Sequence, residues 1–398
     1  MQTKVLSWFA VLWLMSPVHA GTASAQTAEE LFDPSTLHEI RLFINSRDLQ
    51  QLRRNFELNT YYTADLLWRN VRVRNVAVRS RGTGSRNGSK LGLLVDIDRY
   101  STRQRFLGLT ALVLDNAWQD PSFMRDQLAM ATFRRMGQAA PRASFARLFI
   151  NNQYEGLYGI TEPIDDRFLE RSFAETGGYA FEYHWVRQFY GESLGDDLAA
   201  YKPLFEPQNH TLDADATLYG PIRSLLSEVN AAEDPVWRER VSTWLDLEQF
   251  VTQVAIETFL SELDGLLGYD GMNNFYLYRG AGTSRHRIIP WDRDNALQSV
   301  DSSIFLRADE NIILRRALAF DDLRALYLDV LEGCARAALE DAWLEAQIEQ
   351  LVPVIEAAAL EDPKKPFSNE QFAQQTEFLR EFARARPAFV LREVARAR

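Results

Sequence analysis

Six residues that could bind a metal ion or move a proton lie between residues 263 and 297. Carboxylate and carboxamide oxygens are the ligands that Mg²⁺ prefers, and a carboxylate that binds no metal can accept a proton. The alternative interpretation is that these residues form turns, which accounts well for Asp270 and the glycine after it. It accounts less well for two aspartates directly after an apolar run that ends at Trp291, so the spacing leaves both interpretations open. The six residues are Asp264, Asp270, Asn273, Asn274, Asp292 and Asp294.

A predicted hairpin and a predicted helix would position these residues. Residues 274–279 and 287–291 are rich in β-forming side chains, and two glycines lie between them, which predicts a hairpin with the acidic residues at one end. Residues 247–263 carry apolar side chains around most of a helical circumference. We therefore expect a buried helix that holds Asp264 rigidly at its C-terminal end.

A second segment, residues 79–90, combines glycines with basic side chains. It reads RSRGTGSRNGSK and lies between strands predicted at residues 71–78 and 91–97. Backbone N–H groups of such a loop can approach an anion, and Arg81 and Lys90 supply positive charge, so phosphate binding is one hypothesis. The alternative is a flexible hairpin tip with solvated basic side chains. The loop is not a Walker A motif, which needs G-x-x-x-x-G-K-[ST] before a helix.

The composition is that of an ordinary globular protein and argues against several classes of function. The chain has 398 residues, 46% hydrophobic content and a formal net charge of −11. This charge argues against a nonspecific nucleic-acid-binding protein, whose affinity comes from Lys and Arg at phosphates. A single cysteine, Cys334, permits no intrachain disulfide. The histidines lack the spacing of the common zinc motifs, so we do not expect a zinc site.

The first residues are typical of an export signal. Lys4 precedes an apolar run at residues 5–15, and a small-residue cleavage pattern ends at Ala20. We interpret residues 1–28 as a signal peptide and leader. No other run approaches the roughly 20 apolar residues that a membrane span requires. The mature protein is therefore expected outside the cytoplasm, either secreted or in the periplasm or cell envelope, with no transmembrane segment.

Strand-like patterns dominate the first half of the mature sequence, and helical patterns dominate the second half. We expect a β-rich N-terminal lobe at residues 29–183, a polar and aromatic connection at 184–216, and a mainly helical lobe at 217–398. Segregated strands and helices of this kind predict an α+β fold.

Several short motifs carry a resemblance to a known family when they are taken in order. They are RGTGSR at 81–86 with Lys90, DPSFMRD at 120–126, APR at 140–142 with FINNQYEGLY at 149–158, EPID at 162–165, and NNFYLY at 273–278 with IPWDRD at 289–294. Each motif alone is weak, but their order is specific. The chain resembles the spore coat protein H (CotH) kinase family from about Leu37 to the C-terminal helices.

The resemblance implies an atypical, bilobal protein-kinase-like fold that uses ATP and Mg²⁺ or Mn²⁺. In such enzymes a basic residue contacts the phosphates, a carboxylate orients it, and Asp and Asn bind the metal. The resulting assignments are Lys90 and Arg81 to ATP, Glu162 to orienting Lys90, Asp292 and Asn274 to metal, and Asp294 either to metal or to capping the next turn.

Two aspartates are candidates for the catalytic residue beside the substrate hydroxyl. The family usually has an aspartate shortly before the strand that corresponds to NNFYLY, and both Asp264 and Asp270 fit. Asp264 is favoured because it follows the predicted buried helix and lies in an Asp-Gly pair, while Asp270 stays open. The chain departs from the family at Thr83 and Gly84, where Asn and Ser are common, and at Asn273, where His is usual. None of these departures removes a charged group.

The predicted function is phosphorylation of Ser or Thr in an extracytoplasmic protein, with no nucleic-acid partner. One alternative is a noncatalytic secreted surface or assembly protein that keeps the fold for binding. Another is a hydrolase that uses paired carboxylates such as Asp264 and Asp292. The hydrolase would leave Lys90 and Glu162 without a role.

Overall fold

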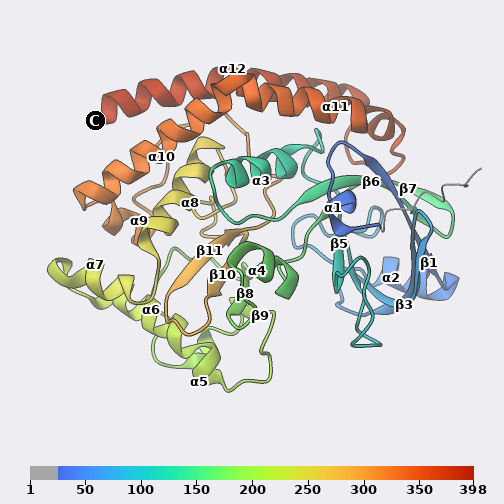
Figure 1. The fold of residues 1–398 in the computed structure, drawn as a ribbon, viewed down its shortest axis with the longest axis horizontal. Helices are drawn as coiled ribbons and strands as arrows, with labels where there is room; N and C mark the ends of the chain where they lie inside the picture. The colour runs from blue at the N-terminus through green and yellow to red at the C-terminus, as the bar shows by residue number, and fades with distance from the viewer. Residues whose placement is uncertain (1–25) are drawn as a thin grey trace, which may run out of the picture.

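Seven strands of the N-terminal half close into a barrel in the computed structural model, which describes residues 26–398 (Figure 1). The strand order is β1-β2-β3-β4-β5-β7-β6, and a parallel pairing of β6 with β1 closes the barrel. Alternate residues of a strand face the interior, so that Ile40, Leu42 and Ile44 of β1 lie in one core cluster. The strands are β1 Leu37–Ile44, β2 Tyr62–Trp68, β3 Val71–Ser80, β4 Leu93–Asp96, β5 Ala111–Asp115, β6 Ala143–Ile150 and β7 Gln153–Thr161.

A second sheet contains the predicted acidic hairpin. Its four strands are β11 His286–Pro290, β10 Phe275–Arg279, β8 Tyr179–Tyr183 and β9 Phe205–Pro207, in that order. The sequence pattern assigns residues 179–183 to the N-terminal lobe, but β8 pairs with β10 and β9 and with no barrel strand among the described residues. Phe181 and Tyr183 explain this placement, because they are buried in the same core cluster as the C-terminal helices.

Helices make up most of the chain after the second sheet begins. The helix α8 is buried on nearly its whole circumference, as its apolar sequence predicts. It ends at Phe259, before the predicted end at residue 263, and Ser261 has a positive φ of 51° that turns the chain away. The helices are α1 Ala28–Leu31, α2 Ser46–Arg54, α3 Arg125–Arg135, α4 Asp166–Phe173, α5 Asp215–Leu218, α6 Gly220–Ala231, α7 Asp234–Ser242, α8 Leu247–Phe259, α9 Ile312–Ala317, α10 Asp321–Leu339, α11 Trp343–Glu361 and α12 Asn369–Ala397.

The last two helices connect the helical part to the barrel. Figure 1 shows α11 and α12 running side by side along one edge of the molecule, and the turn between them lies against the barrel. The helix α11 packs against both α12 and β7. The long C-terminal helices therefore hold the barrel and the helical part in one arrangement, in addition to the chain connection after β7.

The predicted α+β class, with a β-rich N-terminal part and a mainly helical C-terminal part, is confirmed. The predicted signal sequence, with its apolar run at residues 5–15, lies outside the described residues. Among residues 26–398, no helix is both long enough and apolar enough to cross a bilayer.

Candidate active site

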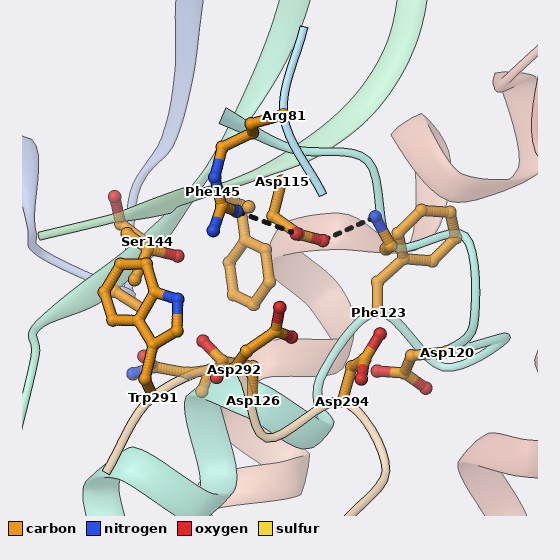
Figure 2. Close-up of a pocket in the computed structure, with 15 residues that line it drawn as sticks. Arg81, Asp115, Asp120, Phe123, Asp126, Ser144, Phe145, Trp291, Asp292 and Asp294 are labelled. Carbon is orange, nitrogen blue, oxygen red and sulfur yellow. Dashed lines mark hydrogen bonds and ion pairs between the residues drawn. The ribbon is translucent and has the colours of Figure 1, made fainter. Parts of the chain in front are cut away.

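Acidic side chains from distant parts of the sequence converge on a pocket between the barrel and the loop that follows β11 (Figure 2). The barrel contributes Asp115 from the end of β5 and Arg81 from just after β3. The first turn of α3 contributes Asp126. The carboxylates that line the pocket belong to Asp115, Asp120, Asp126, Asp292 and Asp294.

Arg81 is the one basic side chain among the described residues that line this pocket. Its guanidinium lies 3.9 Å from Asp115 Oδ2, and its Cζ lies 5.5 Å from the centre of the Trp291 ring. Burial acts to lower the pKa of Arg81, but the negative charges of Asp292 and Glu182 outweigh it, and the pKa is raised. Arg81 is therefore a fixed positive charge inside an acidic pocket.

The two aspartates after β11 carry the most perturbed carboxyl groups of the pocket. Burial and the nearby charge of Asp115 raise the pKa of Asp292 to about 7. Burial and the charge of Asp292 raise the pKa of Asp294 well above its usual range. Asp292 also has a φ of 51°, a conformation that is uncommon for a residue with a side chain. Carboxylates crowded in this way repel one another, so a bound cation would stabilise the charged forms of both.

The donor atoms of this cluster fit a hard divalent cation. They are carboxylate oxygens, and Mg²⁺ and Mn²⁺ prefer such oxygen ligands. Asn274, a predicted metal ligand, does not line the pocket, and its amide donates to Asp264 Oδ2 at 3.0 Å. No protein hydrogen bond within the described residues engages the Asp292 carboxylate, whereas Asp126 Oδ1 accepts the backbone N–H of Arg293 at 2.9 Å. Asp292 is therefore the pocket carboxylate with the most unused acceptor capacity.

Neither Asp264 nor Asp270 lines this pocket, and the two aspartates lie in different surroundings. The amides of Asn273 and Asn274 donate to the Asp264 carboxylate at 3.1 and 3.0 Å. Burial raises the pKa of Asp264, and its charge in turn contributes to the raised pKa of Asp292. Asp270 is exposed, and its backbone carbonyl accepts a hydrogen bond from the Trp185 indole. Of the two predicted catalytic candidates, Asp264 is the one that is partly buried and held by side-chain hydrogen bonds, and which of them is catalytic stays a prediction.

A buried ion pair links the loops that carry these aspartates. Arg293 has no solvent exposure and pairs with Glu257 of α8. The second oxygen of Glu257 accepts the backbone N–H of Leu266 at 2.7 Å. A Cβ added at Gly265 would collide with that same oxygen, so only glycine fits there. The Asp292 loop and the Asp264 loop are thus fixed to one side chain of a rigid, buried helix.

Glu262 supports Asp264 from the side of α8. Glu262 Oε1 accepts the backbone N–H of Asp264 at 2.8 Å, while its Oε2 is buried without a hydrogen-bond partner. Burial raises the pKa of Glu262 to about 8. Sequence patterns did not single out Glu257, Glu262 or Arg293, because an acidic or basic residue is ordinarily interpreted as part of a solvated surface.

Lys90 lies outside the pocket lining and has no solvent exposure. Its Nζ donates to Asp362 Oδ2 at 2.8 Å and to the backbone carbonyl of Leu157 at 2.9 Å. The ring centres of Phe123 and Tyr158 lie 4.9 and 5.1 Å from Nζ. Lys90 therefore joins the barrel to the turn after α11 in this structure.

The expectation that Glu162 orients Lys90 is wrong for this conformation. The Glu162 carboxylate is buried and pairs with Arg142 and Arg171, each at 2.7 Å. A carboxylate already held by two guanidinium groups satisfies its charge locally, so it does not need a distant lysine. Arg81 is the basic residue that the structure brings to Asp292.

Asp115, Asp120 and Asp126 belong to the pocket but were not predicted as site residues. Their sequence positions offered only weak signals, namely the end of a strand for Asp115 and the DPSFMRD motif for the other two. Asp120 has a structural role as well, because its carboxylate accepts the backbone N–H groups of Ser122 and Arg125, each at 2.8 Å. Asp126 points into the pocket from α3 (Figure 2).

The free space among the pocket side chains is small. It amounts to about 30 Å³, which is enough for an ion or one to two waters. Pockets that hold drug-sized molecules are roughly 300–1,000 Å³. Binding of a nucleotide would therefore require the side chains that line this pocket to separate.

Comparisons with known proteins agree with the sequence resemblance. The sequence model of the CotH kinase protein family matches residues 78–390. The chain is 23% identical over 367 residues to the inner spore coat protein H of Bacillus subtilis (strain 168), which covers 89% of this chain and 97% of that protein.

Two solved structures show weaker similarity. One is a chain from the Shewanella oneidensis MR-1 toxin–antitoxin complex of HipA, HipB and operator DNA, with 12% identity and a TM-score of 0.35. That match covers 72% of this chain and 61% of the other. The second is the Helicobacter pylori proinflammatory kinase CtkA, with 10% identity, a TM-score of 0.31, and coverage of 74% of this chain and 92% of the other.

Proposed function

This chain belongs to the CotH kinase protein family, and on that premise we propose that it transfers the γ-phosphoryl group of ATP to a Ser or Thr hydroxyl of an extracytoplasmic protein. The observation that carries this proposal is the pocket itself, in which several converging carboxylates surround a single arginine. Phosphoryl transfer depends on positioning and on neutralising phosphate charge, and these residue types serve both.

The residues that would hold the metal ion are Asp292 and Asp294, with Asn274 as a further ligand. When bound, Mg²⁺ or Mn²⁺ supplies the positive charge that offsets the phosphate oxygens. The fit rests on the oxygen donors and on the raised pKa values of the two aspartates. Asp126 lines the same pocket and would add a further negative charge beside the ion.

Arg81 and Asp264 have complementary roles in the proposed reaction. The Arg81 guanidinium would contact the phosphates of ATP, since it is a charged donor that already faces Asp292. The substrate hydroxyl oxygen would bond to the γ-phosphorus as the bond to the bridging oxygen of ADP breaks, and Asp264 would accept the hydroxyl proton. Asn273 and Asn274 hold the Asp264 carboxylate in place for this step.

We place this activity outside the cytoplasm. The predicted signal sequence supports export, and the Bacillus subtilis relative is named as an inner spore coat protein. A secreted, periplasmic or cell-envelope location would supply protein substrates with exposed Ser or Thr residues. ATP is scarce in these compartments, so the supply of nucleotide is part of what a test in cells must address.

Label transfer from γ-labelled ATP tests the proposal directly. The mature protein would be incubated with Mg²⁺ or Mn²⁺ and envelope proteins, and Asp292→Asn would be compared with Asp309→Asn, which alters an exposed aspartate. We expect wild-type transfer in Asp309→Asn and a loss of about 10²–10³-fold in Asp292→Asn, the size of effect seen when a group that stabilises developing charge is removed. Absence of transfer by the wild type, or undiminished transfer by Asp292→Asn, would contradict the proposal.

A noncatalytic surface or assembly protein is the second candidate function. Two observations favour it: Lys90 is held in an ion pair away from the pocket, and the free space in the pocket is about 30 Å³. Calorimetry with ATP and Mg²⁺ separates the two functions. The noncatalytic candidate predicts no heat of ATP binding, whereas the kinase predicts binding that Asp292→Asn weakens.

A further inference from the structure

Two glutamates face each other across the strands β8 and β9. In the antiparallel register Glu182 pairs with Glu206, and Tyr183 pairs with Phe205. Side chains alternate between the two faces of a sheet, and here Tyr183 and Phe205 are buried in the core while Glu182 and Glu206 point to the other face. Like charges directly opposite on one face of a sheet repel, so this pair needs compensation.

A histidine lies on the same face of the sheet. His184 is two residues after Glu182, and its backbone N–H donates to the carbonyl of Leu204 at 2.8 Å, which continues the ladder by one step. The His184 Nε2 lies 2.7 Å from Glu206 Oε2. One donor atom from each of Glu182, His184 and Glu206 lies within 4.8 Å of the others.

Basic side chains compensate this group only in part. Within residues 26–398, no Lys or Arg nitrogen lies at ion-pair distance from either glutamate, and the partner of Glu206 is His184. Arg81 and Arg79 act on the group only through longer-range electrostatic interactions. The hydrogen bond with Glu206 raises the pKa of His184 and lowers that of Glu206, so the imidazole offsets one carboxylate and leaves the charge of Glu182 without an ion-pair partner in the described part of the chain.

Although the spacing of the histidines along the chain predicts no zinc site, we propose that Glu182, His184 and Glu206, which two strands bring together, form a binding site for a divalent transition-metal ion such as Zn²⁺. An imidazole with two carboxylates is a donor set that zinc accepts, and three protein ligands leave a position for water. At a tetrahedral zinc ion with bonds of about 2.1 Å, two ligand atoms lie roughly 3.4 Å from each other. The three donor atoms lie within 4.8 Å of one another, so their side chains would rotate to close around the ion, and the present His184–Glu206 hydrogen bond would give way to it.

The bound ion would cross-link an edge strand to the second sheet. The strand β9 has three residues and lies at the end of the sheet order, and of these residues only Phe205 is buried. Ligands from both β8 and β9 would fix this edge and would neutralise the repulsion between the two glutamates. This site is separate from the Asp292 cluster, and it stands whether or not the chain transfers phosphate.

Zinc titration in excess Mg²⁺ tests the site, because excess Mg²⁺ competes for sites made of oxygen ligands alone and leaves a site with an imidazole available. Calorimetry should give one Zn²⁺ per mature chain, and the melting temperature should rise with zinc concentration as for any ligand of the folded state. Co²⁺ in place of Zn²⁺ should give a visible absorption band that depends on His184.

Two variants and one control complete the test. Glu182→Gln removes a ligand without breaking an ion pair, so it should fold normally, and His184→Gln removes the imidazole. Each should weaken zinc binding by at least the roughly 10- to 100-fold that loss of an outer-shell partner causes. His210→Gln, which changes an exposed histidine of the same segment, should bind as the wild type does. The proposal is overturned if the wild type binds no Zn²⁺ in excess Mg²⁺, or if either ligand variant binds it as tightly as the wild type.

Discussion

Replacing Lys90 with methionine should destabilise the fold itself, not only nucleotide binding. Both side chains of the Lys90–Asp362 pair have no solvent exposure, and Nζ lies 2.8 Å from Oδ2. Burial lowers the pKa of Lys90 more than the charge of Asp362 raises it. Breaking such a pair leaves a buried charge without its partner, which costs about 3–5 kcal/mol.

The surroundings of Asp362 place Lys90→Met near the lower end of that range. Besides Lys90, its carboxylate accepts the backbone N–H groups of Leu157, Lys364 and Lys365 at 2.9, 2.8 and 3.0 Å. These three hydrogen bonds remain in Lys90→Met, so the backbone N–H groups still partly stabilise the negative charge of Asp362. We expect a loss of about 3 kcal/mol in the free energy of unfolding.

Urea denaturation followed by circular dichroism measures this loss. Lys202→Met is the matched control, because Lys202 pairs with Asp215 at 2.7 Å but both side chains are about half exposed. Exposed pairs contribute little, so the control should unfold at the wild-type urea concentration. The double variant Lys90→Met with Asp362→Asn should lose less than the sum of the two single variants, because it removes both charges.

A different result would restore the role that the sequence suggested for Lys90. If Lys90→Met unfolds within about 1 kcal/mol of the wild type, the ion pair contributes far less than its burial implies. If that variant also binds ATP more weakly, Lys90 contacts phosphate in the bound state. Together these two outcomes would refute the structural role for Lys90.

Three further predictions concern the acidic pocket. The pKa of the Asp292 carboxyl group is about 7 in the folded protein, above its ordinary value of 3.8. The contribution of this group to the free energy of unfolding is therefore fully present below pH 4 and is lost as the pH rises to 7. In metal-free buffer the free energy of unfolding of the wild type should therefore fall relative to that of Asp292→Asn across that range, by up to about 1.4 kcal/mol per pH unit. If urea denaturation gives the same difference between the two proteins at pH 4 and at pH 7, this prediction is wrong. Asp264→Asn should abolish most phosphoryl transfer while Asp270→Asn keeps it, and the reverse pattern in the label-transfer assay would identify Asp270 as the catalytic residue. Glu257→Gln should lower the free energy of unfolding by about 3–5 kcal/mol because its arginine partner is buried; Glu349→Gln, at an exposed pair, should change it little, and equal stability of the two variants would argue against the buried link.

The local sequence was sufficient to predict most secondary structure and the residues that follow it. The apolar runs of β10 and β11, the buried helix α8 and the acidic residues at their ends all depend on side chains close together in the chain. The ordered motifs were also sufficient for the family, and the family-model match confirms that assignment. The fold class follows from the same local patterns, because strands and helices are segregated along the sequence.

The partners of charged residues were decided only by the tertiary structure. Lys90 and Glu162 look like a pair in a kinase-like pattern, yet each is closer to another charge, Asp362 and Arg142 respectively. Buried charges pair with whichever opposite charge the packed chain brings within hydrogen-bond distance, and here Asp362 is 272 residues away from Lys90.

No sequence pattern predicted which acidic side chains would lie close together. Asp115, Asp126 and Asp292 come from a barrel strand, a helix and a loop, and no local pattern relates them. The opposition of Glu182 and Glu206 likewise depends on the register of two strands. Spacing along the chain reports periodicity within one element, whereas these sites depend on how separate elements pack, which only the folded structure specifies.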